Sequence, residues 1–174
     1  MVWPLPVTES YLLPQKSTDL APIFEHLYRA PKGLPPSVFT LSRREAERLP
    51  RLPSIAIISI TTPDHRPADL DGFDHVLRLS FADVDYLNPN FRRKRNDDLD
   101  YRFKKADAKA IWSFIDALPS EVTTIIVHCE GGFSRSCAIA LALYRSCGYM
   151  VNLSALNNSN PSVVKVMMST RHGH

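Results

Sequence analysis

One stretch in the second half of the chain constrains the fold more than any other. An apolar run, residues 124–127, leads into the sequence His128-Cys129-Glu130-Gly131-Gly132-Phe133-Ser134-Arg135-Ser136, and a second run of small and apolar residues, 137–144, follows it. A short apolar run bounded by turn residues is typical of a buried strand, and the longer run that follows is typical of a helix. The sequence therefore predicts a strand, a tight loop and a helix in direct succession.

The loop between this strand and this helix has the composition of an anion-binding site. Gly131 and Gly132 let successive backbone N–H groups turn toward one point, and the N-terminus of the helix adds partial positive charge there. Arg135 adds a planar guanidinium that fits two oxygens of a phosphoryl group. Cys129, six residues before the arginine, would then lie where the thiolate is favoured. A thiolate beneath a bound phosphate is a nucleophile directed at phosphorus.

This loop resembles the signature of cysteine-dependent protein tyrosine phosphatases in its dual-specificity form, His-Cys-x-x-Gly-x-Ser-Arg-Ser. The resemblance extends more loosely over residues 37–170. The positions that match the signature are His128, Cys129, Gly132, Ser134, Arg135 and Ser136.

The resemblance implies a role for each residue of the loop. Cys129 would attack phosphorus and form a phosphocysteine, and Ser136 would hydrogen-bond the sulfur and help it leave. His128 would hold the shape of the loop and support the thiolate. No cofactor and no metal ion are expected, because Arg135 and the backbone amides supply the positive charge. The expected phosphate-binding residues are Glu130, Gly131, Gly132, Phe133, Ser134 and Arg135.

A general acid is expected on a loop that follows an earlier strand. The sequence Phe81-Ala82-Asp83 resembles the Phe-x-Asp of the phosphatase family at this place, which makes Asp83 the first candidate. An acid is needed because the leaving oxygen departs poorly without a proton, an effect worth roughly 10²–10⁴-fold. Asp85 is the alternative, and the sequence leaves open that both are ordinary solvated loop acids.

The remaining pattern predicts a single α/β domain at residues 37–170, with a central, mostly parallel sheet of four to five strands flanked by helices. A Pro-rich N-terminal arm at 1–36 would precede it. The tail from Ser169 to His174 is expected to be frayed, with 171–174 outside the domain. The expected strands are 38–40, 55–60, 75–79 and 122–127. The expected helices are 20–29, 42–49, 105–118, the segment from Arg135 to Cys147-Gly148, and 162–168.

Two further segments leave alternatives open. The arm, which holds seven prolines, is interpreted as packing over the domain rather than as a recognition flap. The segment 88–105 contains Arg92-Arg93-Lys94-Arg95 and three aspartates. It fits a solvated loop, a basic lid that attracts phosphorylated peptide, or, least well, a nucleic-acid patch.

Composition narrows the setting of the protein. No apolar run reaches the length of about 18 residues that a membrane helix needs, and the N-terminus lacks the pattern of a secretory signal. Three cysteines, an odd number, argue against a disulfide framework and for a reducing, cytoplasmic compartment. The net charge of +3 is compatible with phosphorylated substrates and does not by itself indicate nucleic acid. The oligomeric state is left open.

These observations lead us to expect a metal-independent phosphoprotein phosphatase that hydrolyses phosphotyrosine, with phosphoserine and phosphothreonine as further candidate substrates. The expected partner is a phosphorylated protein or peptide, not a membrane. One alternative is a non-catalytic phosphoprotein-binding module on the same fold. Another is a phosphatase for a lipid, a nucleotide or an RNA 5′ phosphate. Glu130 weighs against highly charged phosphoinositides, because the inositol-lipid phosphatases of the family that the loop resembles tend to carry lysine in this loop, where this chain has a glutamate.

Overall fold

The computed structural model describes residues 20–90 and 97–172. The basic run at 92–95, most of the arm and the last two residues of the tail lie outside this part of the chain. Within it, no helix is both long and apolar enough to cross a bilayer.

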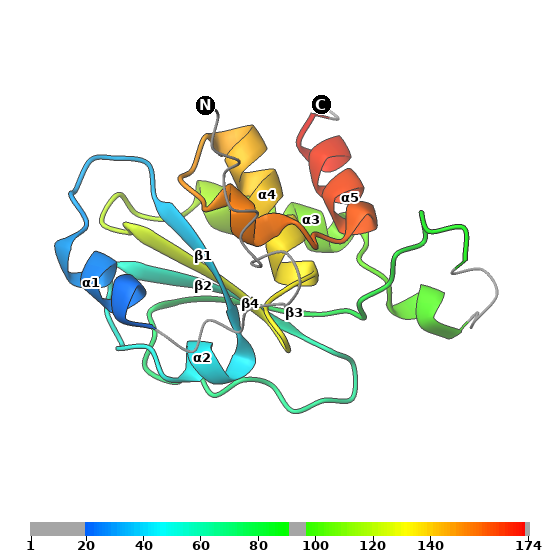
Figure 1. Cartoon of the computed structure of the whole chain (residues 1–174), viewed down its shortest axis with the longest axis horizontal. Coiled ribbons are helices and arrows are strands. Elements are labelled where there is room, and N and C mark those ends of the chain that lie inside the picture. Colours follow the sequence, from blue (N-terminus) through cyan, green and yellow to red (C-terminus); the bar gives the residue numbers. More distant parts are fainter. Residues whose placement is uncertain (1–19, 91–96, 173–174) are drawn as a thin grey trace, which may run out of the picture.

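A four-stranded, all-parallel sheet forms the centre of the described structure (Figure 1). The strand order is β1-β4-β2-β3, so the strand that leads to Cys129 lies inside the sheet. The prediction of an α/β fold with a mostly parallel sheet is confirmed. Because parallel strands end at the same edge, the loops after β4, β2 and β3 meet there. The strands are β1 (Ser37–Ser42), β2 (Ile55–Thr61), β3 (His75–Ser80) and β4 (Thr124–Cys129).

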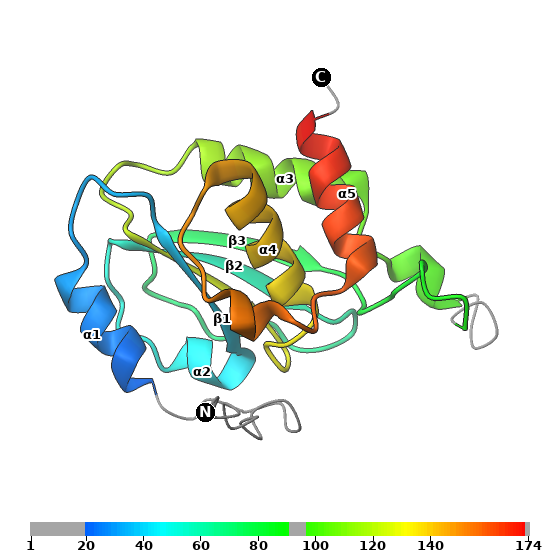
Figure 2. The ribbon, with the colours of Figure 1, turned by 45° about the horizontal axis from the view of Figure 1, so that its top comes forward.

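Helices cover both faces of the sheet (Figures 1 and 2). One face packs against α3, α4 and α5, and the other against α1 and α2. Two short 3₁₀ helices, η3 and η4, lie in the connections. The bounds are α1 (Ala21–Arg29), α2 (Arg43–Glu47), η3 (Asp97–Tyr101), α3 (Lys105–Asp116), α4 (Arg135–Cys147), η4 (Leu153–Leu156) and α5 (Pro161–His172).

The alternation of side chains along β4 gives each face its own hydrophobic core. Ile125, Val127 and Cys129 belong to the core under α3, α4 and α5, whereas Ile126 belongs to the core under α1 and α2. Successive side chains in a strand point to opposite faces. Cys129 therefore lies on the face of the sheet that α4 covers.

Local signals set several helix ends where the sequence predicts them. Ser42 and Glu45 form the expected capping box at the start of α2. The Ser42 hydroxyl accepts the backbone N–H of Glu45, and the Glu45 carboxylate accepts the backbone N–H of Ser42. Gly148 ends α4 in the left-handed conformation, with φ of 67°, which glycine adopts without a Cβ clash. The helix expected at 42–49 is shorter and ends at Glu47.

The two ends of the domain differ from the prediction. α5 continues to His172, so the expectation of a frayed tail from Ser169 is wrong for its first four residues. Met167 and Thr170 are buried, and this packing extends the helix. At the other end, Leu20 and Leu27 are part of the hydrophobic core under α1 and α2. The predicted domain boundary at residue 37 would leave α1 outside the domain, although α1 contributes to the core of that domain.

Candidate active site

The loop from Cys129 to Arg135 turns so tightly that one of its glycines has no substitute. Gly132 has a φ of +78°, and a Cβ added there would lie 2.6 Å from the carbonyl carbon of Leu41 and 2.7 Å from the nitrogen of Ser42. A side chain is thus excluded both by conformation and by the close approach of the end of β1. The N–H of Arg43 also donates to the carbonyl oxygen of Glu130 at 3.3 Å. The start of α2 therefore helps to hold the loop.

The sulfur of Cys129 lies at the base of this loop and is surrounded by donors. The side chain is 3 % exposed. The backbone N–H of Gly132 donates to Sγ at 3.2 Å, and the hydroxyl of Ser136 lies 3.3 Å from it. Within the described part of the chain, the N–H groups of Gly131, Phe133 and Ser134 donate to no acceptor. The loop thus offers backbone N–H groups that an anion can accept.

The guanidinium of Arg135 is held in place by the ends of two neighbouring strands. Arg135 begins α4 and is 5 % exposed. Its Nη1 donates to Thr62 Oγ1 at 3.0 Å and to the carbonyl oxygen of Phe81 at 2.9 Å. Its buried Nε has no partner among the described residues. A buried charged donor without a partner is costly, so the site suits a ligand that accepts this N–H.

The two candidate acids make different contacts. Oδ1 of Asp83 accepts hydrogen bonds from the hydroxyl of Ser134 at 2.9 Å and from Nδ2 of Asn160 at 2.8 Å. Oδ1 of Asp85 accepts from the hydroxyl of Ser162 at 2.7 Å and from the N–H of Leu87 at 3.1 Å. The structure brings Asp83 to the loop that carries Cys129, and it places Asp85 at the start of α5.

Asn160 links three parts of the site, and sequence reasoning gave it no role there. It is 4 % exposed. Besides Asp83, its amide donates to the carbonyl oxygen of Val84 at 3.1 Å, and its Oδ1 accepts from the N–H groups of Ser162 and Val163. Its own backbone N–H donates to the carbonyl oxygen of Ser134 at 3.2 Å. The Asn-Pro pair that starts α5 was the available signal, but it indicates a helix cap rather than a partner for Asp83.

Thr62 was also missed. It lies in the loop just after β2, and ligands bind near the carboxyl ends of parallel strands. That position was the only signal in the sequence for it. Nothing in the local pattern indicates that its hydroxyl accepts a hydrogen bond from Arg135.

His128 is buried in the sheet rather than in the loop. Its Nε2 lies 2.7 Å from the hydroxyl of Ser59 in β2, and its Nδ1 lies 3.5 Å from the carbonyl oxygen of Cys129. Burial is the main cause that lowers the pKa of His128 from 6.5 to about 4, because a low-dielectric surrounding disfavours the charged ring. The ring is therefore neutral at pH 7. It fixes the end of β4 against β2 and brings no positive charge to the sulfur.

The other two cysteines have different surroundings from Cys129. Burial raises the pKa of Cys137 to about 11, and its thiol contacts the carbonyl oxygens of Gly132 and Ala155. Burial also raises the pKa of Cys147. Both thiols stay protonated at neutral pH, which fits structural positions in α4.

The remaining residues of the loop lie at its rim. Glu130 and Gly131 are exposed, whereas Phe133 and Ser134 are half-buried. Phe133 lies over Gly131, since a Cβ added to that glycine would be 3.1 Å from the Phe133 ring.

The structure thus brings together the loop 129–136, Asp83 and His128. Of the candidate residues, Asp85 alone contacts other groups, the hydroxyl of Ser162 and the N–H of Leu87.

Comparison with known proteins adds no family to this description. No model of a protein family matches the chain, and no curated protein matches it. The resemblance to the phosphatases therefore rests on the motif in this loop.

Proposed function

We propose that this protein is a phosphoprotein phosphatase that hydrolyses phosphotyrosine through a phosphocysteine on Cys129. The observation that carries the proposal is the arrangement around one sulfur. Cys129 Sγ accepts the N–H of Gly132, and the N–H groups of Gly131, Phe133 and Ser134 in this loop have no acceptor among the described residues. Arg135, six residues further along the same loop, is anchored through Nη1, and its buried Nε has no partner among the described residues. The burial of Cys129, which is 3 % exposed, favours phosphotyrosine, whose side chain is longer than that of phosphoserine.

The first chemical step transfers the phosphoryl group to sulfur. The Cys129 thiolate forms an S–P bond while the bond between phosphorus and the leaving oxygen breaks. Arg135 and the loop amides bind the other phosphate oxygens, whose charge is redistributed in the transition state. Asp83 is exposed at the rim of the loop and gives its proton to the leaving oxygen.

The second step releases phosphate. A water molecule attacks the phosphocysteine, and Asp83, now a carboxylate, takes its proton. The S–P bond breaks, and Cys129 leaves as a thiolate that the hydroxyl of Ser136 and the N–H of Gly132 stabilise. A thiolate nucleophile works in a reducing compartment, so the proposal includes a cytoplasmic setting.

Turnover of an aryl phosphate tests the proposal. Cys129→Ser is expected to reduce kcat by at least about 10³-fold, because a hydroxyl in the same place is a far weaker nucleophile. Cys147→Ser is the matched control, since Cys147 is at the far end of α4, and it should keep activity within about threefold. Full activity of Cys129→Ser would overturn the proposal. Binding of phosphotyrosine peptide without any turnover by the unmodified chain would favour a non-catalytic binding module instead.

A further inference from the structure

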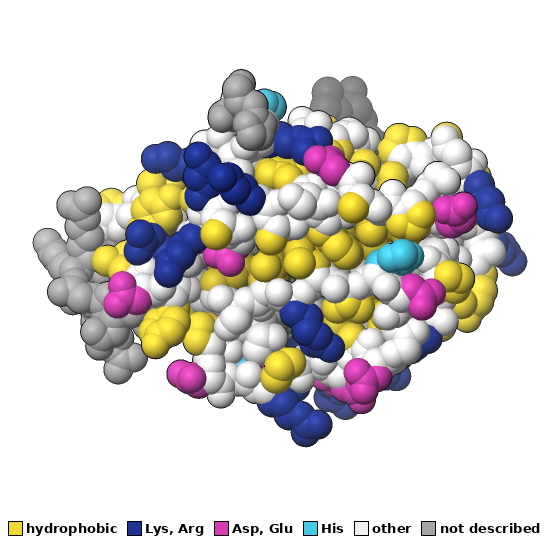
Figure 3. Space-filling view, turned by 180° about the vertical axis from the view of Figure 1, so that it is seen from behind, with side chains coloured by type: hydrophobic (Ala, Val, Ile, Leu, Met, Phe, Trp, Pro, Cys, Tyr) yellow, Lys and Arg dark blue, Asp and Glu magenta, His cyan; other side chains and the backbone are white. Residues whose placement is uncertain are grey.

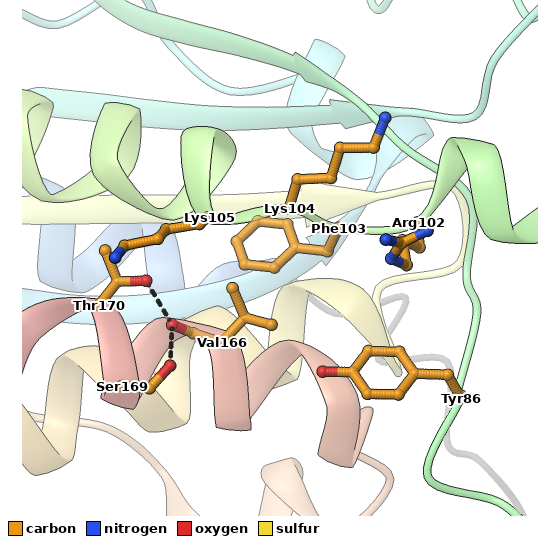
Figure 4. A pocket seen from close by; sticks show the side chains of 8 residues that line it. All are labelled: Tyr86, Arg102, Phe103, Lys104, Lys105, Val166, Ser169 and Thr170. Atoms are coloured by element: carbon orange, nitrogen blue, oxygen red, sulfur yellow. Dashed lines mark hydrogen bonds between the residues drawn. The ribbon is translucent and has the colours of Figure 1, made fainter. Parts of the chain in front are cut away.

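A cavity lies beside the loop that carries Asp83. It has a volume of about 330 Å³ and is open between η3, the N-terminus of α3 and the second half of α5 (Figure 4). Its lining includes Tyr86, Arg102, Phe103, Lys104, Lys105 and Thr170. We call it the acid-loop pocket, because Tyr86 follows Asp83 by three residues. Cys129 does not line it.

The acid-loop pocket is rich in cations that have no acidic partner among the described residues. Arg102, Lys104 and Lys105 are exposed, and none of them forms an ion pair with a described residue. The side chain of Lys105 extends to Thr170 on α5, whereas Lys104 extends away from that helix (Figure 4). Figure 3 shows that Lys and Arg side chains gather at the end of the molecule that carries η3. Such a group of like charges attracts an anion.

Among the described side chains, the carboxylates closest in sequence to these cations are those of Asp100 and Asp107, and neither forms an ion pair with a described residue. Asp107 accepts the backbone N–H of Lys104 at 2.8 Å, and Asp85 accepts the hydroxyl of Ser162. The hydroxyl of Thr170 donates to the carbonyl oxygen of Val166 at 2.7 Å. The positive charge of the pocket is thus not neutralised by these groups.

Direct contacts connect the pocket to the phosphate loop. The ring of Phe103, which is 4 % exposed, packs against the ring of Phe81 with centroids 4.8 Å apart. The carbonyl oxygen of Phe81 is the one that holds Arg135. In addition, the N–H of Ala82 donates to the carbonyl oxygen of Tyr101 at 2.8 Å. Phe103 therefore joins the lining of the acid-loop pocket to the residue that holds the guanidinium of Arg135, and each extended residue of a bound peptide covers about 3.3–3.6 Å of the surface between the two.

We propose that the acid-loop pocket binds a second anionic group of the substrate peptide, the phosphate or carboxylate of a residue close to the phosphotyrosine. Arg102 and Lys105 form charge-assisted hydrogen bonds to this group. The pocket thereby selects phosphotyrosines with an acidic or phosphorylated neighbour. The identity of the substrate in this inference rests on the proposed function.

Peptide binding to Cys129→Ser protein tests the inference without any need for turnover. Each peptide carries one phosphotyrosine, and a serine, phosphoserine or glutamate is placed one to five residues away on either side. At a salt concentration near 0.15 M, a second anion at a suitable spacing should tighten Kd about tenfold. The added double substitution Arg102→Gln/Lys105→Gln should remove that gain and change Kd for the serine peptides by less than about threefold. Lys109→Gln, an exposed residue of α3 that does not line the pocket, is the matched control and should keep the gain.

The comparison of phosphoserine with glutamate identifies the preferred anion, and a gain with either supports the pocket. Four results would overturn the inference: no gain at any spacing, an equal loss for all peptides in the double variant, the same loss in Lys109→Gln, or no peptide binding. If the double substitution weakened only the binding of single-stranded RNA, the pocket would serve nucleic acid and the inference would be wrong. Failure of the proposed function is seen separately, as unchanged aryl phosphate turnover in Cys129→Ser.

Discussion

Two aspartates that are two residues apart lie in different surroundings. Asp83 accepts hydrogen bonds from Ser134 and Asn160, whereas Asp85 accepts from Ser162 and Leu87. The Phe-x-Asp pattern in the sequence favours Asp83, and these contacts distinguish the two residues further. At the scale of the residue, matched substitutions of Asp83 and Asp85 test which of the two is the general acid.

We predict that Asp83→Asn lowers kcat/KM for phosphotyrosine by about 10²-fold or more, because the leaving oxygen no longer receives a proton. With an aryl phosphate whose leaving group is a weak base, the loss should be much smaller. Asp85→Asn should change both values by less than about fivefold. Steady-state kinetics with the two substrates checks this, and a larger loss in Asp85→Asn would assign the acid to Asp85 instead.

The buried ring of His128 predicts a dependence of stability on pH. Its pKa is about 4 in the folded protein against 6.5 ordinarily, so between these values the unfolded chain binds a proton that the folded chain does not. Stability is therefore lost as the pH falls, by about 2 kcal/mol from about pH 7 to about pH 5. Urea unfolding at both pH values measures the loss. His128→Gln, which does not titrate, should show a correspondingly smaller difference, and an equal difference in both proteins would contradict the assignment.

At the scale of the element, the turn from β4 to α4 depends on how closely it approaches β1. Gly132 and Gly148 both have positive φ values, 78° and 67°. A Cβ at Gly132 would overlap the backbone of Leu41 and Ser42, whereas one at Gly148 would meet nothing within 4 Å. The same substitution therefore has different consequences at the two ends of α4.

We predict that Gly148→Ala costs about 1 kcal/mol of unfolding free energy, from conformational strain alone. Gly132→Ala should cost about 3 kcal/mol, because overlap with the backbone adds to the strain. It should also weaken phosphate binding, since the displaced loop moves the N–H that contacts the Cys129 sulfur. Denaturant unfolding and phosphate titration check both variants. Equal costs at the two glycines would show that the loop can shift away from β1 freely.

At the scale of the whole molecule, the sheet separates two cores, and α1 belongs to one of them. Leu27 is 6 % exposed and packs in the core under α1 and α2, whereas its neighbour Tyr28 is 66 % exposed. The ring of His26 also contacts that of Phe39 in β1, with centroids 5.2 Å apart. The helix in the Pro-rich arm thus stabilises the edge of the sheet next to β4.

We predict that Leu27→Ala lowers the free energy of unfolding by about 2–3 kcal/mol, from lost burial and the cavity left behind. Tyr28→Ala should lower it by less than about 0.5 kcal/mol. Chemical denaturation of both variants gives the comparison. A small effect at Leu27 would mean that α1 is not coupled to the folding of the domain.

The sequence by itself determined the local features of this protein. The four strands, the capping box of Ser42 and Glu45 and the glycine at the end of α4 follow from residue types within a few positions of each other, where hydrophobic period and backbone preference act. The loop from Cys129 to Arg135 was predictable for the same reason, since its glycines, cysteine and arginine are contiguous.

Only the tertiary structure decided which distant groups complete the site. Thr62 and the carbonyl oxygen of Phe81 hold Arg135, and Asn160 holds Asp83. These partners are far apart along the chain and meet because the parallel strands end at one edge of the sheet. The inclusion of α1 in the core and the extension of α5 to His172 likewise depend on packing between elements. Long-range packing has no signature in a local pattern, because the burial that stabilises it is supplied by other parts of the chain.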